Sequence, residues 1–282
     1  MQNNNELLKN LAHQEAKRLL VEDSAIQSIS IVGSVAYELT DQYSDIDLLI
    51  LYNDISDEQY ELWRKDAEYL NPVYVIGGKE HDFMTVGRYV EGIKIDFGRI
   101  KADKFQQSVD AVIKNNDIEL SHQAVLFGIN NSEVFYDKGI VADWRKQIEV
   151  YPEALIFKTL QTSLTFTPKS VYEGMGVYRN DSLFIYECLV EDLKKMLQTI
   201  FCLNRVYHPG KAKGLNWIIE QQLPIQPTDF LQRMQSLLNS KEAEGVAEML
   251  RLIAEVYELV GRERPDFDLT AFWKRFEVKL RE

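Results

Sequence analysis

Cysteine is scarce in this chain, with only Cys188 and Cys202 among 282 residues. Both fall within one stretch of helical periodicity, roughly 21 Å apart along a helix axis, so they cannot form a disulfide with each other. No cysteine spacing typical of a zinc site is present. Free thiols are typical of a reducing compartment, and we therefore expect a cytoplasmic protein.

Long apolar runs and an excess of positive charge are also missing. No segment approaches the roughly 18 apolar residues that span a bilayer, and the first residues do not resemble a signal peptide, so no membrane partner is expected. Lysine and arginine total 32 against 44 aspartate and glutamate residues, which gives a formal net charge of −12. DNA is not expected as a partner, because non-specific nucleic-acid binding needs a basic surface.

Two halves of different character make up the chain. Hydrophobic residues form 45% of it and charged residues 27%, as is typical of a soluble globular protein. The first half predicts helices at 6–22, 56–70, 102–114 and 143–150 and strands at 26–32, 46–52, 73–76, 82–89, 93–100 and 133–139. The second half has only helical periods, at 152–166, 181–207, around 217–218, and at 228–238, 242–260 and 269–280. We predict an α+β fold, with a mixed-sheet domain at 1–150 and a helical bundle at 151–282.

Local signals refine the helical half. Residues 174–180 predict a loop, and Asn180 or Asp181 is expected to cap the long helix that follows. Gly261 is expected to end a later helix. Asp192 lies on the long helix with Glu187 and Glu191, and the three are interpreted as a solvated acidic face, with attraction of a cationic acceptor as the alternative.

The most informative stretch is 26–52. A strand ends at Gly33 and Ser34, a short helical patch and a polar loop follow, and a second strand opens with Asp45 and Asp47. Residues i and i+2 of a strand point to the same face, so the two carboxylates project together and repel each other unless a cation lies between them. Carboxylate oxygens suit Mg²⁺, and the Gly-Ser turn offers N–H groups and a hydroxyl to an anion.

A third acidic side chain is predicted from the strand at 93–100. Lys94 and Asp96 share one face of this strand, and apolar residues share the other. A mid-strand carboxylate between apolar neighbours is suited to a metal site, although a solvated polar face is an equally simple interpretation of Asp96 taken alone.

The segments VGSVAY (32–37) and SDIDL (44–48) carry a family resemblance. They resemble the signature of the DNA-polymerase-β-like nucleotidyltransferase superfamily, and most closely that of the antibiotic (aminoglycoside and lincosamide) nucleotidyltransferases and their relatives. The similar region covers roughly residues 30 to 100. The helical half is similar only in general layout, as a C-terminal helical substrate domain.

This resemblance implies a catalytic metal site. Asp45, Asp47 and Asp96 are the implied metal-binding and catalytic carboxylates, with two Mg²⁺ ions expected. Asp82 and Glu91 are nearby alternatives for the third position, and Asp96 is preferred for its apolar strand neighbours.

The reaction implied is displacement at the α-phosphorus of a nucleoside triphosphate, with ATP expected as the donor and pyrophosphate as the leaving group. Gly33 and Ser34 are expected to bind the β- and γ-phosphates. Asp96, or a glutamate of the helical half, is expected to act as general base towards the acceptor hydroxyl. The acceptor is expected to be a small molecule, first an aminoglycoside or a lincosamide, bound between the two domains of a monomer or homodimer.

Two alternatives stay open. One is adenylylation of a protein or RNA partner of the toxin–antitoxin type, and the other is a non-catalytic nucleotide-binding regulator. In the helical half, Arg179, Lys211 and Lys213 are candidates for phosphate contacts and Tyr207 for stacking on a base or sugar. Helix caps and exposed loop charges are the simpler interpretation of these four residues.

Overall fold

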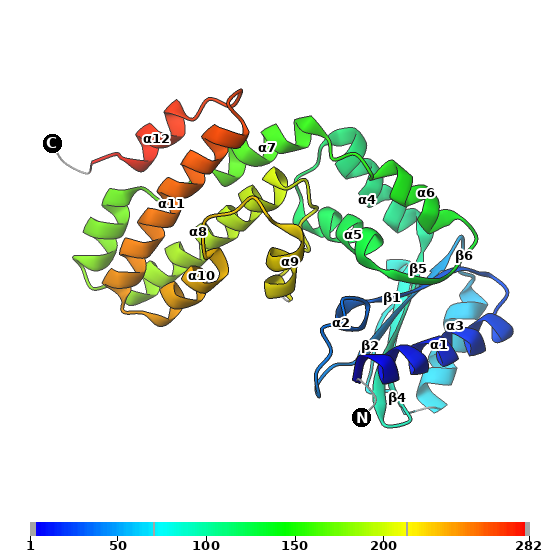
Figure 1. Cartoon of the computed structure of the whole chain (residues 1–282). Coiled ribbons are helices and arrows are strands. Elements are labelled where there is room, and N and C mark those ends of the chain that lie inside the picture. Colours follow the sequence, from blue (N-terminus) through cyan, green and yellow to red (C-terminus); the bar gives the residue numbers. More distant parts are fainter. Residues whose placement is uncertain (1–3, 70, 213, 280–282) are drawn as a thin grey trace. The chain divides into compact units, whose positions relative to one another are not determined.

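The chain forms two compact units, Met1–Val150 and Tyr151–Glu282. A computed structural model describes residues 4–69, 71–212 and 214–279, and each unit is described by itself. The first unit combines a sheet with helices, whereas the second is helical (Figure 1). The predicted α+β class, with a mixed sheet followed by a helical region, is confirmed.

The elements of the first unit alternate along the chain. Its strands are β1 (Ile26–Val32), β2 (Ile46–Tyr52), β3 (Tyr74–Gly78), β4 (Phe83–Val90), β5 (Ile93–Lys101) and β6 (Glu133–Asp137). Its helices are α1 (Asn4–Glu22), α2 (Gly33–Ala36), α3 (Asp57–Tyr69), the 3₁₀ turn η1 (Lys79–His81), α4 (Ala102–Asn115), α5 (Leu120–Asn131) and α6 (Ile140–Gln147).

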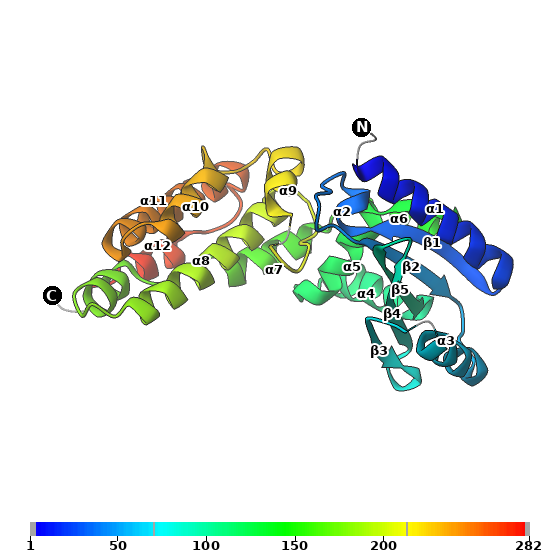
Figure 2. The ribbon, with the colours of Figure 1, turned by 90° about the horizontal axis from the view of Figure 1, so that it is seen from below.

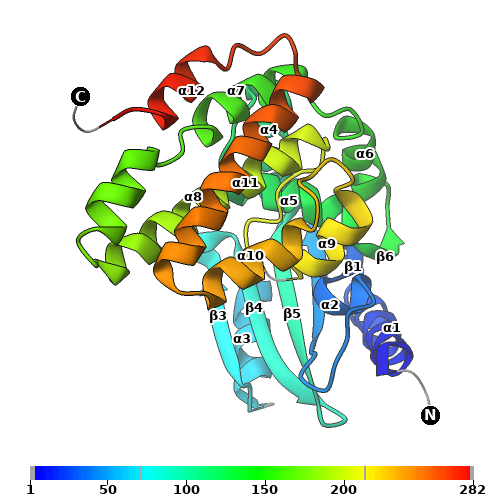
Figure 3. The ribbon, with the colours of Figure 1, turned by 60° about the vertical axis from the view of Figure 1, so that its left-hand side comes forward.

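The six described strands form one sheet in the order β3-β4-β5-β2-β1-β6. Strands β2 and β5 pair in parallel, and the other described pairs are antiparallel. Figure 3 shows β3, β4 and β5 side by side. Because β3 and β4 separate β2 from β5 in the sequence, this parallel pair joins distant segments of the chain.

One face of the sheet packs against α1 and α3 (Figure 2). The apolar stripe of α1, which includes Leu8, Ala12 and Leu19, is buried there. Alternate residues of β2 point to the same core, among them Ile46 and Leu48. The intervening residues of β2, including Asp47, are thereby left for the opposite face.

Helix α5 was not predicted. Its buried residues include Gln123, Leu126, Phe127 and Ile129, which do not follow a simple amphipathic stripe. This helix packs on α4 and α6, so apolar residues are tolerated around much of its circumference. The ends predicted at residues 70 and 280 for two other helices lie outside the described residues.

The second unit is a set of helices. They are α7 (Glu153–Ser163), the π-helix η2 (Val171–Val177), α8 (Ser182–Leu203), α9 (Leu215–Gln222), α10 (Phe230–Asn239), α11 (Glu242–Glu263) and α12 (Thr270–Phe276). None of the helices within the described residues combines the length and the apolar character that a membrane crossing requires.

Three local predictions for this unit have different outcomes. Asp181 caps α8, because its carboxylate accepts a hydrogen bond from the Phe184 N–H. The predicted loop at 174–180 is wrong in its first part, where η2 extends to Val177. Gly261 does not end a helix either, since α11 continues to Glu263.

The interpretation of Asp192 as a solvated side chain is also wrong. Asp192 is fully buried and accepts hydrogen bonds from the Tyr172 hydroxyl (2.9 Å) and the Thr167 N–H (2.9 Å). Lys195 pairs with its other oxygen at 3.1 Å. A charged residue on the buried side of α8 is retained because these three donors replace its hydration.

His208 gives the second unit a pH-dependent stability. Burial lowers the pKa of His208 to about 4 from an ordinary value of 6.5, and its Nδ1 accepts a hydrogen bond from the Gly210 N–H. Between these two pH values the His208 side chain is therefore protonated in the unfolded chain but not in the folded chain. The free energy of unfolding has its full value above about pH 6.5. It decreases as the pH falls towards 4, and is lower by about 2 kcal/mol at pH 5. Urea unfolding at pH 7 and pH 5 measures this loss.

The matched control is His208→Asn, which keeps an acceptor for Gly210 but does not titrate in this range. The loss of stability between pH 7 and pH 5 should be smaller by about 2 kcal/mol in this variant. An unchanged loss would assign the pH dependence to other groups.

Candidate active site

The register of the sheet brings two of the predicted carboxylates together. Asp47 is the direct partner of Asp96 in the parallel pair of β2 and β5. On its other side Asp47 is opposite Val32, the last residue of β1. Partners in neighbouring strands project to the same face, so the Asp47 and Asp96 side chains leave the sheet together.

A lysine links the third carboxylate to this pair. Lys94 Nζ lies 2.7 Å from Asp45 Oδ2 and 2.8 Å from Asp96 Oδ2. Burial disfavours the charged form of Lys94, but the hydrogen bonds to Asp45 and Asp96 outweigh this effect and raise its pKa. One ammonium thus holds together two acidic side chains from different parts of the chain.

Strands β3 and β4 supply one wall of the site. Gly87 is opposite both Asp96 and Tyr74, and a Cβ at Gly87 would lie 2.8 Å from Asp96 Oδ1 and from the Tyr74 ring. The absence of a side chain at Gly87 therefore lets Tyr74 approach Asp96. Burial and the Asp96 carboxylate raise the pKa of Tyr74, and Lys94 Nζ lies 5.2 Å from its ring centroid.

The turn before α2 approaches Asp47 closely. Gly33 has φ +70°, a left-handed conformation that favours glycine. A Cβ on Gly33 would lie 2.7 Å from Asp47 Oδ2. The turn is closed by hydrogen bonds from the Tyr37 N–H to the Gly33 carbonyl (3.1 Å) and from the Leu39 N–H to the Ser34 carbonyl (2.9 Å). The backbone of the Gly-Ser turn and a strand carboxylate therefore form one continuous surface.

The loop between α2 and β2 is fixed by its own polar groups. Asp41 accepts hydrogen bonds from the Tyr43 N–H (2.8 Å) and the Ser44 hydroxyl (3.0 Å). The Ser44 hydroxyl also accepts from the Asp41 N–H at 2.8 Å. These bonds define the approach to Asp45, which directly precedes β2 and is partly buried.

The chemical type of the three carboxylates suits a hard cation. Asp45, Asp47 and Asp96 offer carboxylate oxygens, which Mg²⁺ prefers. Asp96 Oδ1 is buried and has no hydrogen-bond partner among the described residues, and such an atom can serve as a ligand. Nowhere in 4–69, 71–212 and 214–279 do three or more acidic, histidine or cysteine side chains converge as a metal site. Lys94 instead supplies the positive charge shared by Asp45 and Asp96.

The two alternatives for the third carboxylate lie elsewhere. Asp82 follows η1 and pairs with Lys101 (3.2 Å) and Lys104 (3.4 Å). Glu91 is in the turn between β4 and β5, where it is exposed and has φ +51°. Among the three candidates, Asp96 is the one in register with Asp47.

The predicted residues of the second unit are distributed differently. Arg179 and Lys211 are exposed, and their assignment to a nucleotide site remains a prediction. Lys213 lies outside the described residues. Tyr207 is 3% exposed and stacks on Tyr151 with ring centroids 4.9 Å apart. Tyr207 is therefore no candidate for stacking on a base or sugar, and it is no exposed loop residue either, because its ring packs within the core.

Sequence reasoning missed Tyr74 and Gly87. Their place beside Asp96 depends on the antiparallel registers of β3, β4 and β5, which the sequence does not display locally. The position of Lys94 beside Asp96 could be predicted, because strand alternation places the two residues on the same face.

The first unit combines a mixed sheet, a Gly-Ser turn and two adjacent strand carboxylates. Residues 13–116 match the family described as the nucleotidyltransferase domain, which confirms the predicted resemblance of this region to the nucleotidyltransferase superfamily, while the closer likeness to the antibiotic enzymes stays a prediction. Residues 119–217 match a second family, described as a domain of unknown function (DUF4037), which begins in the first unit and ends in the second.

One solved structure with partial similarity is a nucleotidyltransferase-like protein from Exiguobacterium sibiricum 255-15. It has 13% sequence identity and a TM-score of 0.34, and the match covers 90% of this chain and 77% of that one. Among curated proteins, none matches the chain.

Proposed function

We propose that this protein is a Mg²⁺-dependent nucleotidyltransferase that transfers a nucleoside monophosphate, with ATP as the expected donor, to a hydroxyl of a small molecule. The observation that carries the proposal is the group formed by Asp45, Asp47, Asp96 and Lys94, in which Asp47 and Asp96 are partners in parallel strands and Lys94 pairs with Asp96 and Asp45. The nucleotidyltransferase domain that matches residues 13–116 contains all four residues.

The residues of the site have distinct roles in this proposal. Asp45, Asp47 and Asp96 would hold Mg²⁺, which would stabilise the negative charge on the phosphate oxygens of the nucleotidyl group being transferred. Gly33 and Ser34 would position the donor phosphates beside Asp47, since the Gly33 backbone is close to that carboxylate. Asp96, or a glutamate of the second unit, would accept the proton of the acceptor hydroxyl.

The acceptor is proposed by resemblance alone, as an aminoglycoside or a lincosamide. The decisive experiment incubates the protein with radiolabelled nucleoside triphosphates, Mg²⁺ and either a panel of these antibiotics or a cell lysate. Label on a small molecule together with pyrophosphate release is the expected result. Label on a protein or RNA would favour adenylylation of a macromolecule, and nucleotide binding without any turnover would favour the regulator.

Lys94→Met is expected to tighten Mg²⁺ binding in the absence of nucleotide by at least about tenfold. The Lys94 ammonium and the metal ion are cations that compete for the same carboxylates, so the variant removes the internal competitor. Isothermal titration with Mg²⁺ measures the affinity. Melting in a chelator at low salt should show a lower Tm than wild type, because Asp45 and Asp96 then lack their shared counter-charge.

Lys104→Met is the matched control, because Lys104 pairs with Asp82 at 3.4 Å and makes no described contact with the three carboxylates. Its Mg²⁺ affinity should equal that of wild type. Equal affinities for Lys94→Met and wild type would show that Lys94 does not occupy the cation position.

A further inference from the structure

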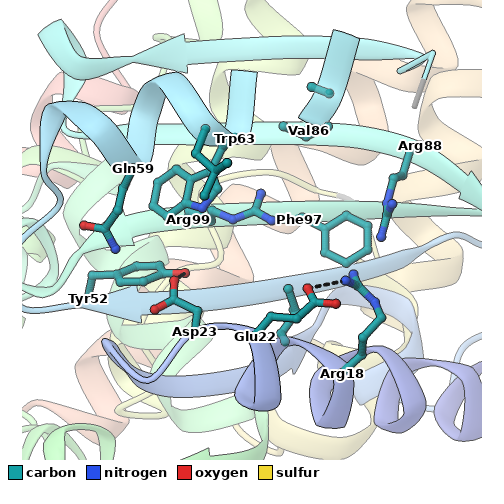
Figure 4. A pocket seen from close by; sticks show the side chains of 13 residues that line it. Arg18, Glu22, Asp23, Tyr52, Gln59, Trp63, Val86, Arg88, Phe97 and Arg99 are labelled. Carbon is teal, nitrogen blue, oxygen red and sulfur yellow. Dashed lines mark hydrogen bonds and ion pairs between the residues drawn. The ribbon is translucent and has the colours of Figure 1, made fainter. Parts of the chain in front are cut away.

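A cavity of about 300 Å³ lies on the other face of the same sheet. Its walls come from α1, α3 and strands β2, β4 and β5 (Figure 4). Phe97 and Arg99 of β5 line it, whereas Asp96 projects from the opposite face by strand alternation. The cavity is therefore separate from the carboxylate site.

Arg99 is the unusual group in this cavity. Its guanidinium carbon lies 4.9 Å from the centroid of the Trp63 ring and 5.8 Å from that of Phe97, so it reaches between two aromatic side chains (Figure 4). Its Nε atom is buried and has no hydrogen-bond partner among the described residues. Burial lowers the pKa of Arg99, the interaction with Tyr52 partly opposes this effect, and the nearby charges of Arg88 and Arg18 lower the pKa further.

The carboxylates around the cavity are engaged by other groups. Glu15 pairs with Arg18 (2.8 Å) and with Arg88 (3.1 Å). Glu22 also pairs with Arg18. Asp23 accepts a hydrogen bond from the Tyr52 hydroxyl at 3.0 Å. Within the described part of the chain, no ion pair joins Arg99 to a carboxylate, so its charge lacks an anionic partner.

Arg99 is only partly exposed, and a largely desolvated charge without an anionic partner is costly, since aromatic faces offset only part of that cost. An anion in the cavity would supply the missing partner and form charge-assisted hydrogen bonds with the guanidinium. The rest of the lining is mixed, with apolar Leu19 and Val86 beside the aromatic rings and the polar Gln59 among them. Such walls favour a ligand with a flat or apolar body next to its charged group.

We propose that this cavity is a binding site for a small aromatic anion, with its carboxylate or phosphate on Arg99 and its ring against Trp63 and Phe97. The volume of about 300 Å³ lies at the small end of ligand pockets and suits a compact molecule rather than a whole nucleotide. Because this cavity and the Asp96 carboxylate lie on opposite faces of β5, the proposal does not depend on nucleotidyl transfer.

The test uses the full chain and three probes: benzoate, phenyl phosphate and the neutral analogue benzamide. Trp63 fluorescence and isothermal titration should show saturable binding of at least one anion with a Kd below about 1 mM, and none of benzamide. Comparing the two anions separates a carboxylate site from a phosphate site. Loss of the fluorescence change in Trp63→Phe, with binding retained by titration, assigns the signal among the four tryptophans.

Arg99→Met keeps the length and apolar stem of the side chain and removes its charge, so the anion should bind at least about tenfold more weakly. Arg64→Met is the matched control, because Arg64 lies on α3, is exposed and pairs with Glu61 outside the cavity. Asp47→Asn should bind the anion as wild type does, since its change lies on the opposite face of the sheet.

Arg99→Lys provides a second variant should Arg99→Met fail to fold. Lysine keeps the charge but loses the planar donor pair, so weaker but measurable binding is expected. The proposal is overturned by the absence of saturable anion binding to wild type, by equal binding of benzamide, or by unchanged affinity in both Arg99 variants.

Discussion

An Asp47→Asn enzyme is expected to lose about 10³-fold in the kcat of nucleotidyl transfer while keeping its fold. Asp47 lies between Val32 of β1 and Asp96 of β5, and an amide of nearly equal size preserves that packing. The substitution removes one of the negative charges proposed to hold Mg²⁺ on the donor phosphates, an interaction worth several kcal/mol in the transition state. Pyrophosphate release with the acceptor identified by the screen gives kcat, and circular dichroism monitors the fold.

Asp54→Asn is the control for this substitution. Asp54 follows β2, its side chain is 84% exposed, and it pairs with Lys101 at 3.1 Å away from the carboxylate group. The same chemical change at Asp54 should leave kcat within about twofold of wild type, since exposed pairs contribute little energy. Wild-type activity in Asp47→Asn would contradict the assignment of Asp47 to the metal site.

Gly33→Ala is expected to reduce activity by at least about 10²-fold, far more than its stability cost alone explains. Alanine at φ +70° costs roughly 1–2 kcal/mol of unfolding free energy. Its Cβ would also lie 2.7 Å from Asp47 Oδ2, so the carboxylate must move. A side-chain end moves at small cost in stability, but here the displaced group is a proposed metal ligand. Steady-state kinetics and urea unfolding of the same preparation separate the two effects.

Gly92→Ala measures the cost of placing alanine in a left-handed backbone conformation, without a steric clash. Gly92 has φ +82° and lies in the turn between β4 and β5, where an added Cβ would meet no atom of the described residues within 4 Å. Its unfolding free energy should fall by a similar amount, roughly 1–2 kcal/mol, with activity close to wild type. Equal losses of activity in both alanine variants would contradict the prediction that the close approach of Gly33 to Asp47 matters for activity.

Local patterns were sufficient for much of the fold. Helix α1 was predicted within two residues at its start because its apolar residues form one stripe. Helix α5 was missed because its buried residues do not form such a stripe. The short strands were located by their turns, including Glu91 and Gly92, both of which have positive φ.

The candidate site was predictable only where neighbours in sequence become neighbours in space. Alternation along a single strand placed Lys94 and Asp96 on one face. The pairing of Asp47 with Asp96 depends instead on the parallel register of β2 and β5, which no local pattern specifies. Arg99 offered an overlooked signal, because it continues the face of Ile95 and Phe97 and breaks its apolar character.

The parallel register also has a consequence for the order in which the chain folds. Lys94 and Asp45 are 49 positions apart, and the segment between them must close a large loop before β5 docks on β2. Lys94 and Asp96, by contrast, are neighbours on one strand and approach β2 together. Strand β5 therefore carries its own neutralising charge to the strand end where Asp45 and Asp47 lie, which reduces the repulsion among the three carboxylates when the two strands pair.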